Sequence, residues 1–133
     1  MDNLILTICL VGSLFTKGDT LTVIAKNVQV GKGTVVVDIW DDEKMLFKKP
    51  FLEVSQKADH DTLAFSFVLP EGQYAISVYQ DINDNKKLDL GLFGIPKEPT
   101  GFGNNFRPRF SAPKYKDCAI LLTQSTTEEI ELK

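Results

Sequence analysis

The stretch that decides the fold class is Thr62-Leu63-Ala64-Phe65-Ser66-Phe67-Val68-Leu69, followed by Pro70-Glu71-Gly72 and then by Tyr74-Ala75-Ile76-Ser77-Val78-Tyr79. In both long runs, large apolar residues recur at every second position, which is the period of a β-strand with one buried face. The Pro-Glu-Gly segment between them is typical of a turn. The pattern therefore predicts two consecutive strands and a β-rich fold.

Strand signals continue on both sides of this pair. Gly31-Lys32-Gly33 predicts a turn, and Pro50 is expected to end a short segment or to place it at a sheet edge. No stretch of twelve residues beyond the first sixteen shows a 3.6-residue apolar period. Short strands with frequent turns predict an all-β fold, an antiparallel Greek-key β-sandwich of about seven strands. The expected strands and segments are 21–30, 34–40, 45–47, 62–69, 74–79, 117–123 and 129–132.

Length and composition exclude several classes of protein. A chain of 133 residues with 43% apolar and 25% charged residues is expected to fold as one globular domain. The formal net charge of −3 argues against a nucleic-acid partner, because such binding depends on neutralising phosphates. One histidine (His60) and two cysteines (Cys9 and Cys118) exclude zinc fingers, iron–sulfur centres and multi-histidine metal sites.

The first sixteen residues, 1–16, are predicted to be a signal peptide. The uncharged run from Leu4 to Phe15 suits its apolar part and is shorter than the roughly 20 residues that a membrane-spanning helix needs. Small residues precede a cleavage site near Ser13, although Asp2 stands where a positive charge is usual. The alternative is a first β-strand. We expect an exported protein (periplasm, cell surface or medium), with 17–133 as its single domain and no transmembrane segment in the mature chain.

The segment 81–89 carries oxygen-bearing side chains at regular spacing. Asp81, Asn83, Asn85 and Asp89 stand at relative positions 1, 3, 5 and 9, and the backbone carbonyl of Lys87 supplies the seventh position. Calcium takes six to eight oxygen ligands, so this spacing predicts a structural calcium site. The alternative is a loop rich in Asp and Asn because these residues form local turns.

Four sequence motifs together resemble the domain of unknown function 2141 family. They are Leu69–Ala75, Asp81-x-Asn83-x-Asn85-x-x-x-Asp89, Phe93–Glu98 and Gly101–Asn105. The resemblance covers roughly residues 20–133 and implies a small exported bacterial protein with a transthyretin-like (prealbumin-like) sandwich and no established activity. Similar calcium loops in related bacterial surface sandwiches favour the metal site. One departure is Lys86, which stands where the family usually has glycine and which adopts a left-handed backbone less readily.

The long segment 81–116 holds the remaining candidates for function. A metal-independent alternative is a cell-envelope module that binds glycan or protein through this segment, whereas packing of the aromatic rings onto the sandwich is the simpler explanation. Its candidate residues are Phe93, Glu98, Phe102, Asn104, Asn105 and Phe106. His60 lies between Asp59 and Asp61 in an expected surface turn, and Cys118 precedes an apolar run that indicates a buried thiol. A small hydrolase using His60 is a third alternative, but no nucleophile partner is evident and we expect no enzyme.

Overall fold

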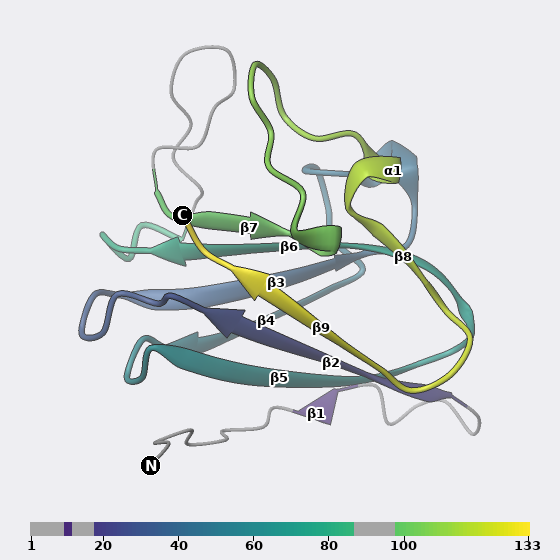
Figure 1. Ribbon diagram of the computed structural model, residues 1–133, viewed down its shortest axis with the longest axis horizontal. Coiled ribbons are helices and arrows are strands. Elements are labelled where there is room, and N and C mark those ends of the chain that lie inside the picture. The colour runs from purple at the N-terminus through teal and green to yellow at the C-terminus, as the bar shows by residue number, and fades with distance from the viewer. Residues whose placement is uncertain (1–9, 12–17, 87–97) are drawn as a thin grey trace.

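The computed structural model describes residues 18–86 and 98–133, and the backbone of residues 10–11, as two β-sheets (Figure 1). The first sheet has the strand order β1-β5-β2-β9: β1 (Leu10–Val11), β5 (Thr62–Leu69), β2 (Asp19–Lys26) and β9 (Thr126–Glu131). The second has the order β4-β3-β6-β7, with β8 also on β6: β4 (Leu52–Lys57), β3 (Thr34–Trp40), β6 (Gly72–Asp81), β7 (Thr100–Phe102) and β8 (Ala119–Leu122). The all-β, two-sheet prediction is confirmed.

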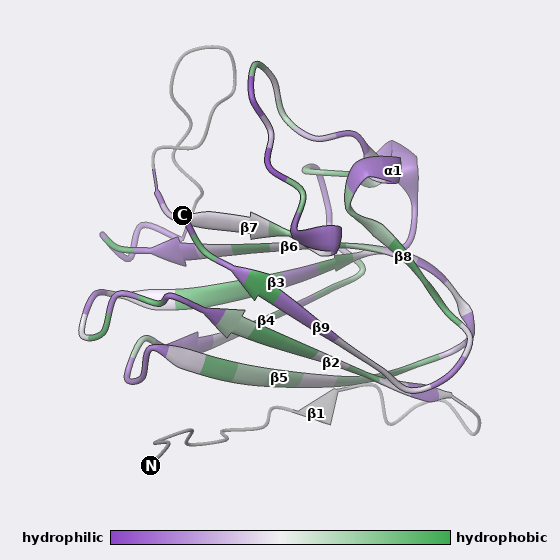
Figure 2. Cartoon of the chain, viewed as in Figure 1, coloured by the Kyte–Doolittle hydropathy of each residue, from purple (hydrophilic) through white to green (hydrophobic). Residues whose placement is uncertain are grey.

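One apolar core lies between the two sheets. Val23 and Phe65 from the first sheet and Val37 and Ile76 from the second are almost fully buried in it. The alternation in β3 and β6 places these residues inward, while their neighbours point to the outer face of the second sheet. Figure 2 shows the corresponding hydrophobic colour along β2, β3 and β5 and polar colour over α1 (Tyr115–Cys118). The core therefore explains the two-residue period of the sequence.

The two consecutive strands β5 and β6, which contain the alternating apolar residues of 62–69 and 74–79, do not pair with each other. β5 belongs to the first sheet and β6 to the second, so the turn at Pro70-Glu71 carries the chain across the sandwich. The hydroxyl of Tyr74 donates to the backbone oxygen of Pro70 at 2.7 Å and ties this crossing to the start of β6. The turn was predicted, and its role as a link between sheets is the new information.

Two strand pairs are parallel, which differs from the purely antiparallel sheet expected. β9 runs parallel to β2, with Leu21 opposite Thr126, and β1 runs parallel to β5, with Leu10 opposite Ser66. Parallel neighbours need a long connection between them, and almost the whole domain lies between β2 and β9. Apart from β1, the predicted signal peptide lies outside the described residues.

The strand expected at 45–47 is wrong. The chain there forms a 3₁₀ helix, η1 (Glu43–Met45), because the carboxylate of Asp42 accepts a hydrogen bond from the Lys44 amide at 2.9 Å. A turn follows over 46–48, in which Phe47 adopts a left-handed backbone (φ 61°). The strand begins only after Pro50, as β4, and pairs with β3 along an edge of the second sheet.

The outer face of the second sheet carries a second, smaller cluster of buried residues. Trp40, Ala75 and Phe102 lie on this face, and α1 packs Tyr115 and Cys118 against them. The Cys118 thiol is fully buried, as expected, and burial raises its pKa to about 11. The residues of the long segment thus include part of the hydrophobic interior.

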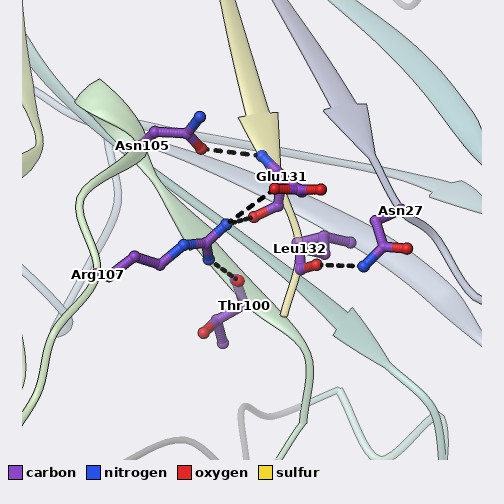
Figure 3. Close-up of polar contacts among 6 residues, drawn as sticks. All are labelled: Asn27, Thr100, Asn105, Arg107, Glu131 and Leu132. Atoms are coloured by element: carbon purple, nitrogen blue, oxygen red, sulfur yellow. Dashed lines mark hydrogen bonds and ion pairs between the residues drawn. The ribbon is translucent and has the colours of Figure 1, made fainter.

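The C-terminal strand is fastened to the second sheet by a group of polar contacts (Figure 3). The guanidinium of Arg107 donates to the backbone oxygens of Thr100 and Glu131. Its Nη2 atom also lies 4.0 Å from the Glu131 carboxylate. The Asn105 side chain accepts from the Glu131 amide at 3.1 Å, and Asn27 donates to the Leu132 oxygen at 2.7 Å. This C-terminal clasp holds β7 beside the end of β9.

Candidate functional site

The predicted calcium segment is the first part of the connection between two neighbouring antiparallel strands. β6 ends at Asp81, and β7 returns with Thr100 opposite Tyr79. The Gln80 amide donates to the Pro99 oxygen at 2.9 Å, which closes the base of this connection. The described part comprises 82–86 and 98–99, so the predicted site residues Lys87, Asp89 and Phe93 lie outside the described residues.

Asp81 points into the loop that follows it. The residue is only 2% exposed, and its two carboxylate oxygens accept the amides of Asn85 (3.2 Å) and Lys86 (2.7 Å). The Asn83 side-chain oxygen accepts from the same Asn85 amide, also at 3.2 Å. Two of the predicted donor oxygens, from Asp81 and Asn83, therefore approach one nitrogen. Asn83 and Asn85 themselves are exposed at the surface.

In the described part of this loop, 82–86, two residues have left-handed backbone. Asp84 has φ 53° and Lys86 has φ 63°, so Lys86 adopts the conformation for which glycine is better suited. The hydrogen bond that the Lys86 backbone amide donates to the buried Asp81 carboxylate offsets part of that cost, because hydrogen bonds to charged acceptors are strong. Asp84 is exposed, and its carboxylate accepts a hydrogen bond from the Thr34 hydroxyl at 3.0 Å.

Glu98 returns to the start of the same loop. Its carboxylate accepts a hydrogen bond from the Ile82 amide at 2.9 Å, although sixteen positions separate the two residues. Nearby, the Tyr79 phenol has its pKa raised, first by burial and then by the negative charges of Asp38, Glu53, Asp81 and Glu98. Asp81 and Glu98 therefore place two carboxyl groups at the end of β6.

The loop rests on a seat that sequence reasoning missed. The fully buried Gln80 side chain donates to the backbone oxygens of Gln29 (2.7 Å) and Lys32 (2.6 Å) and accepts from the Gln29 amide (2.9 Å). Gly33 has φ 68°, and a Cβ there would lie 1.9 Å from the backbone oxygen of Asp81, so this position requires glycine. The signal in the sequence was a glutamine on the inward-facing phase of β6, in line with Tyr74, Ile76 and Val78.

The described residues of the predicted partner loop have partners inside the protein. Phe102 is 2% exposed, and Phe106 packs against the same outer cluster. The Asn104 side chain donates to the backbone oxygens of Asp117 (3.3 Å) and Ala119 (2.9 Å), and Asn105 belongs to the C-terminal clasp. Among the described residues of the 81–116 segment, Phe110 is the aromatic residue that faces solvent, at 84% exposure.

Other chemistry-bearing residues are scattered. His60 lies in the turn between β4 and β5, between Asp59 and Asp61, as the sequence indicated. Within 18–86 and 98–133, no group of three or more His, Cys, Asp or Glu side chains is arranged to hold a metal ion. The predicted loop site differs from such a group, because amide and backbone oxygens make up most of its donors.

Three comparisons with known proteins bear on the chain. Searches of curated proteins and of solved structures found no significant match. In the part of the chain that the structure describes, no helix has the length and apolar character needed to cross a bilayer. A family model matches residues 23–130, from within β2 to within β9, and includes the 81–89 segment and Arg107 of the clasp. The chain therefore belongs to the family described as "Uncharacterized protein conserved in bacteria (DUF2141)".

Proposed function

We propose that this protein is an exported, non-enzymatic sandwich of the transthyretin-like Greek-key kind, whose 81–89 loop is ordered by calcium. The ion is held by side-chain oxygens of Asp81, Asn83, Asn85 and Asp89 and by the Lys87 carbonyl. Bound calcium acts structurally: it fixes the connection between β6 and β7, which then presents a defined surface. An envelope protein or glycan is the expected partner.

The observation that carries the proposal is the inward-facing carboxylate of Asp81. A carboxylate has about four lone-pair sites, and the two hydrogen bonds that Asp81 accepts from backbone amides occupy only part of this capacity. The Asn83 oxygen approaches the same amide nitrogen, and Glu98 adds a second carboxylate at the loop start. Hard cations prefer such oxygen donors, so the residues present fit calcium.

The expected affinity is weak. Two formal charges among the five donors place the dissociation constant at roughly 10⁻⁴ to 10⁻³ M, as in extracellular modules. Binding to the folded state alone stabilises it by RT ln(1 + [L]/Kd), which is about 1.4 kcal/mol at tenfold excess over Kd. For a domain of this size, that stabilisation raises the melting temperature by about 5 °C.

The test compares two aspartates of the same loop. We expect wild type to melt about 5 °C higher in about 10 mM calcium than in chelator. Asp81→Ala should abolish the difference, whereas Asp84→Ala should keep it, because Asp84 turns toward Thr34. Identical melting of wild type in calcium and in chelator would refute the metal role.

A second candidate is supported by one exposed ring. Phe110 projects into solvent, it follows the exposed Arg109 in the chain, and the exposed Lys114 stands four positions further on. An aromatic face next to positive charge suits an anionic glycan, so this protein is also a candidate metal-independent envelope-binding module. Phe110→Ala should reduce binding to an anionic polysaccharide such as heparin at unchanged melting temperature. Equal retention of both proteins on a heparin column would exclude this surface.

A further inference from the structure

Two carboxyl groups oppose each other across an edge of the second sheet. Asp38 on β3 is directly opposite Glu53 on β4, and both side chains lie on the outer face, because Val37 and Ile39 occupy the inner one. Their environments differ greatly: Asp38 is 7% exposed, whereas Glu53 is exposed. Like charges directly opposite each other in a sheet destabilise the pairing.

The surroundings of Asp38 favour its neutral form. Its Oδ1 atom is buried and has no hydrogen-bond partner, and the side chain is hydrogen-bonded to Glu53. Opposite Asp38 on β6, the Ser77 oxygen accepts the Trp40 indole N–H at 3.0 Å. The nearest titratable group of β6 on this face is the Tyr79 phenol, and the described residues place no ion-pair partner on either carboxyl. A buried carboxylate with so few donors is costly, whereas a carboxylic acid that donates to Glu53 is not.

We propose that one proton, held by Asp38 and donated to Glu53, fastens edge strand β4 to β3, and that its loss releases β4 locally. β4 suits such a device because, within the described residues, β3 is its only strand partner. Its side chains alternate between half-buried and exposed, so its detachment uncovers less apolar surface than the loss of a central strand.

The direction of the pH effect follows from proton linkage. Burial, then the hydrogen bond and charge of Glu53, raise the pKa of Asp38 from 3.8 to about 8. In the open state, Asp38 regains its ordinary pKa, so the closed state binds one more proton between the two values. Opening therefore becomes about tenfold more favourable per pH unit as the pH rises from about 4 to about 8, and levels off above that.

Amide hydrogen exchange of the full chain tests this proposal. Wild type and Asp38→Asn are compared at the same pH, so that the intrinsic pH dependence of exchange cancels; asparagine keeps the shape and has no proton to lose. We expect β4 protection in wild type to fall relative to Asp38→Asn by about tenfold per pH unit between about pH 6 and 8, with β2 and β5 unchanged. Asp59→Asn, which removes an exposed carboxyl from the β4–β5 turn, should behave as wild type.

Three results would overturn the proposal. The first is that β4 protection depends on pH equally in wild type and Asp38→Asn. The second is that Asp59→Asn changes this pH dependence as much as Asp38→Asn does. The third is that the loss of protection at high pH is spread evenly over both sheets. Glu53→Gln provides an independent check, because it removes the like charge from an exposed position where folding is not at risk. It should leave β4 better protected than wild type at about pH 9, and the opposite order would also contradict the proposal.

Discussion

Tyr115 illustrates how single polar groups join distant parts of the fold. Its hydroxyl lies 3.1 Å from the Trp40 backbone oxygen and 3.0 Å from the Gln73 backbone oxygen, so one O–H group links the end of β3 to the start of β6. The ring itself is 7% exposed within the outer cluster. Burial, then the charge of Asp41, raise its pKa, which keeps the phenol protonated as a donor.

Replacing Tyr115 by phenylalanine tests this role. The ring remains packed, but two backbone oxygens lose their buried donor, which we expect to cost about 1–2 kcal/mol. Urea denaturation of wild type and Tyr115→Phe measures the difference. A free energy of unfolding equal to that of wild type would show that water replaces the hydroxyl without cost.

Local sequence patterns made some site residues predictable and left others hidden. Asp81 was recognisable as a candidate because its spacing to the side-chain amides of Asn83 and Asn85 is regular. Gln80 and Gly33 were not recognisable as the seat of the loop, because their contacts join β6 to a turn about fifty positions away. Such contacts depend on which strands become neighbours, and the spacing of residues within one strand does not contain that information.

At the scale of elements, short strands depend on contacts from outside themselves. β7 has three residues and includes Gly101, where a Cβ would lie 2.4 Å from the Ile130 side chain. The glycine weakened the strand signal in the sequence, yet close approach to β9 requires it. β4 was also missed. It begins only after the turn that follows η1, and the apolar pattern of the sequence does not indicate the left-handed backbone of Phe47 in that turn.

The C-terminal clasp makes a prediction at the same scale. Arg107→Ala removes the donor to the Thr100 and Glu131 oxygens, and we expect it to destabilise the domain by about 1–3 kcal/mol. Arg109→Ala, an exposed arginine two residues away, should change stability by less than about 0.5 kcal/mol. Chemical denaturation of both variants checks the contrast, and equal effects would show that the clasp does not stabilise the fold.

For the molecule as a whole, the sandwich is closed by its C-terminal residues. Leu132 is fully buried in the main core, just past the end of β9, and its backbone is held by Asn27 and by the Lys26 oxygen. The all-β class was predictable, because strand alternation reports one buried face. The parallel pairing of β2 with β9 was not, because it joins strands separated by about a hundred residues.

Leu132→Ala is therefore expected to be strongly destabilising for a residue next to the chain end. A buried leucine truncated to alanine costs about 2–5 kcal/mol, because the cavity adds to the lost burial. Leu121→Ala is the matched control: this leucine of β8 is 68% exposed and should cost less than about 0.5 kcal/mol. Thermal denaturation distinguishes them, and similar melting temperatures would mean that the C-terminal residues do not close the core.

The proposed ordering of the 81–89 loop by calcium is tested most directly by following backbone amide signals in an NMR titration with calcium chloride. We expect saturable shifts of the Ile82, Asn83, Asn85 and Lys86 amides with a midpoint of roughly 10⁻⁴ to 10⁻³ M, and unchanged signals in β2. Asp81→Ala should lose these shifts. Signals from 82–86 that stay unchanged up to about 10 mM calcium, well above that midpoint, would contradict it.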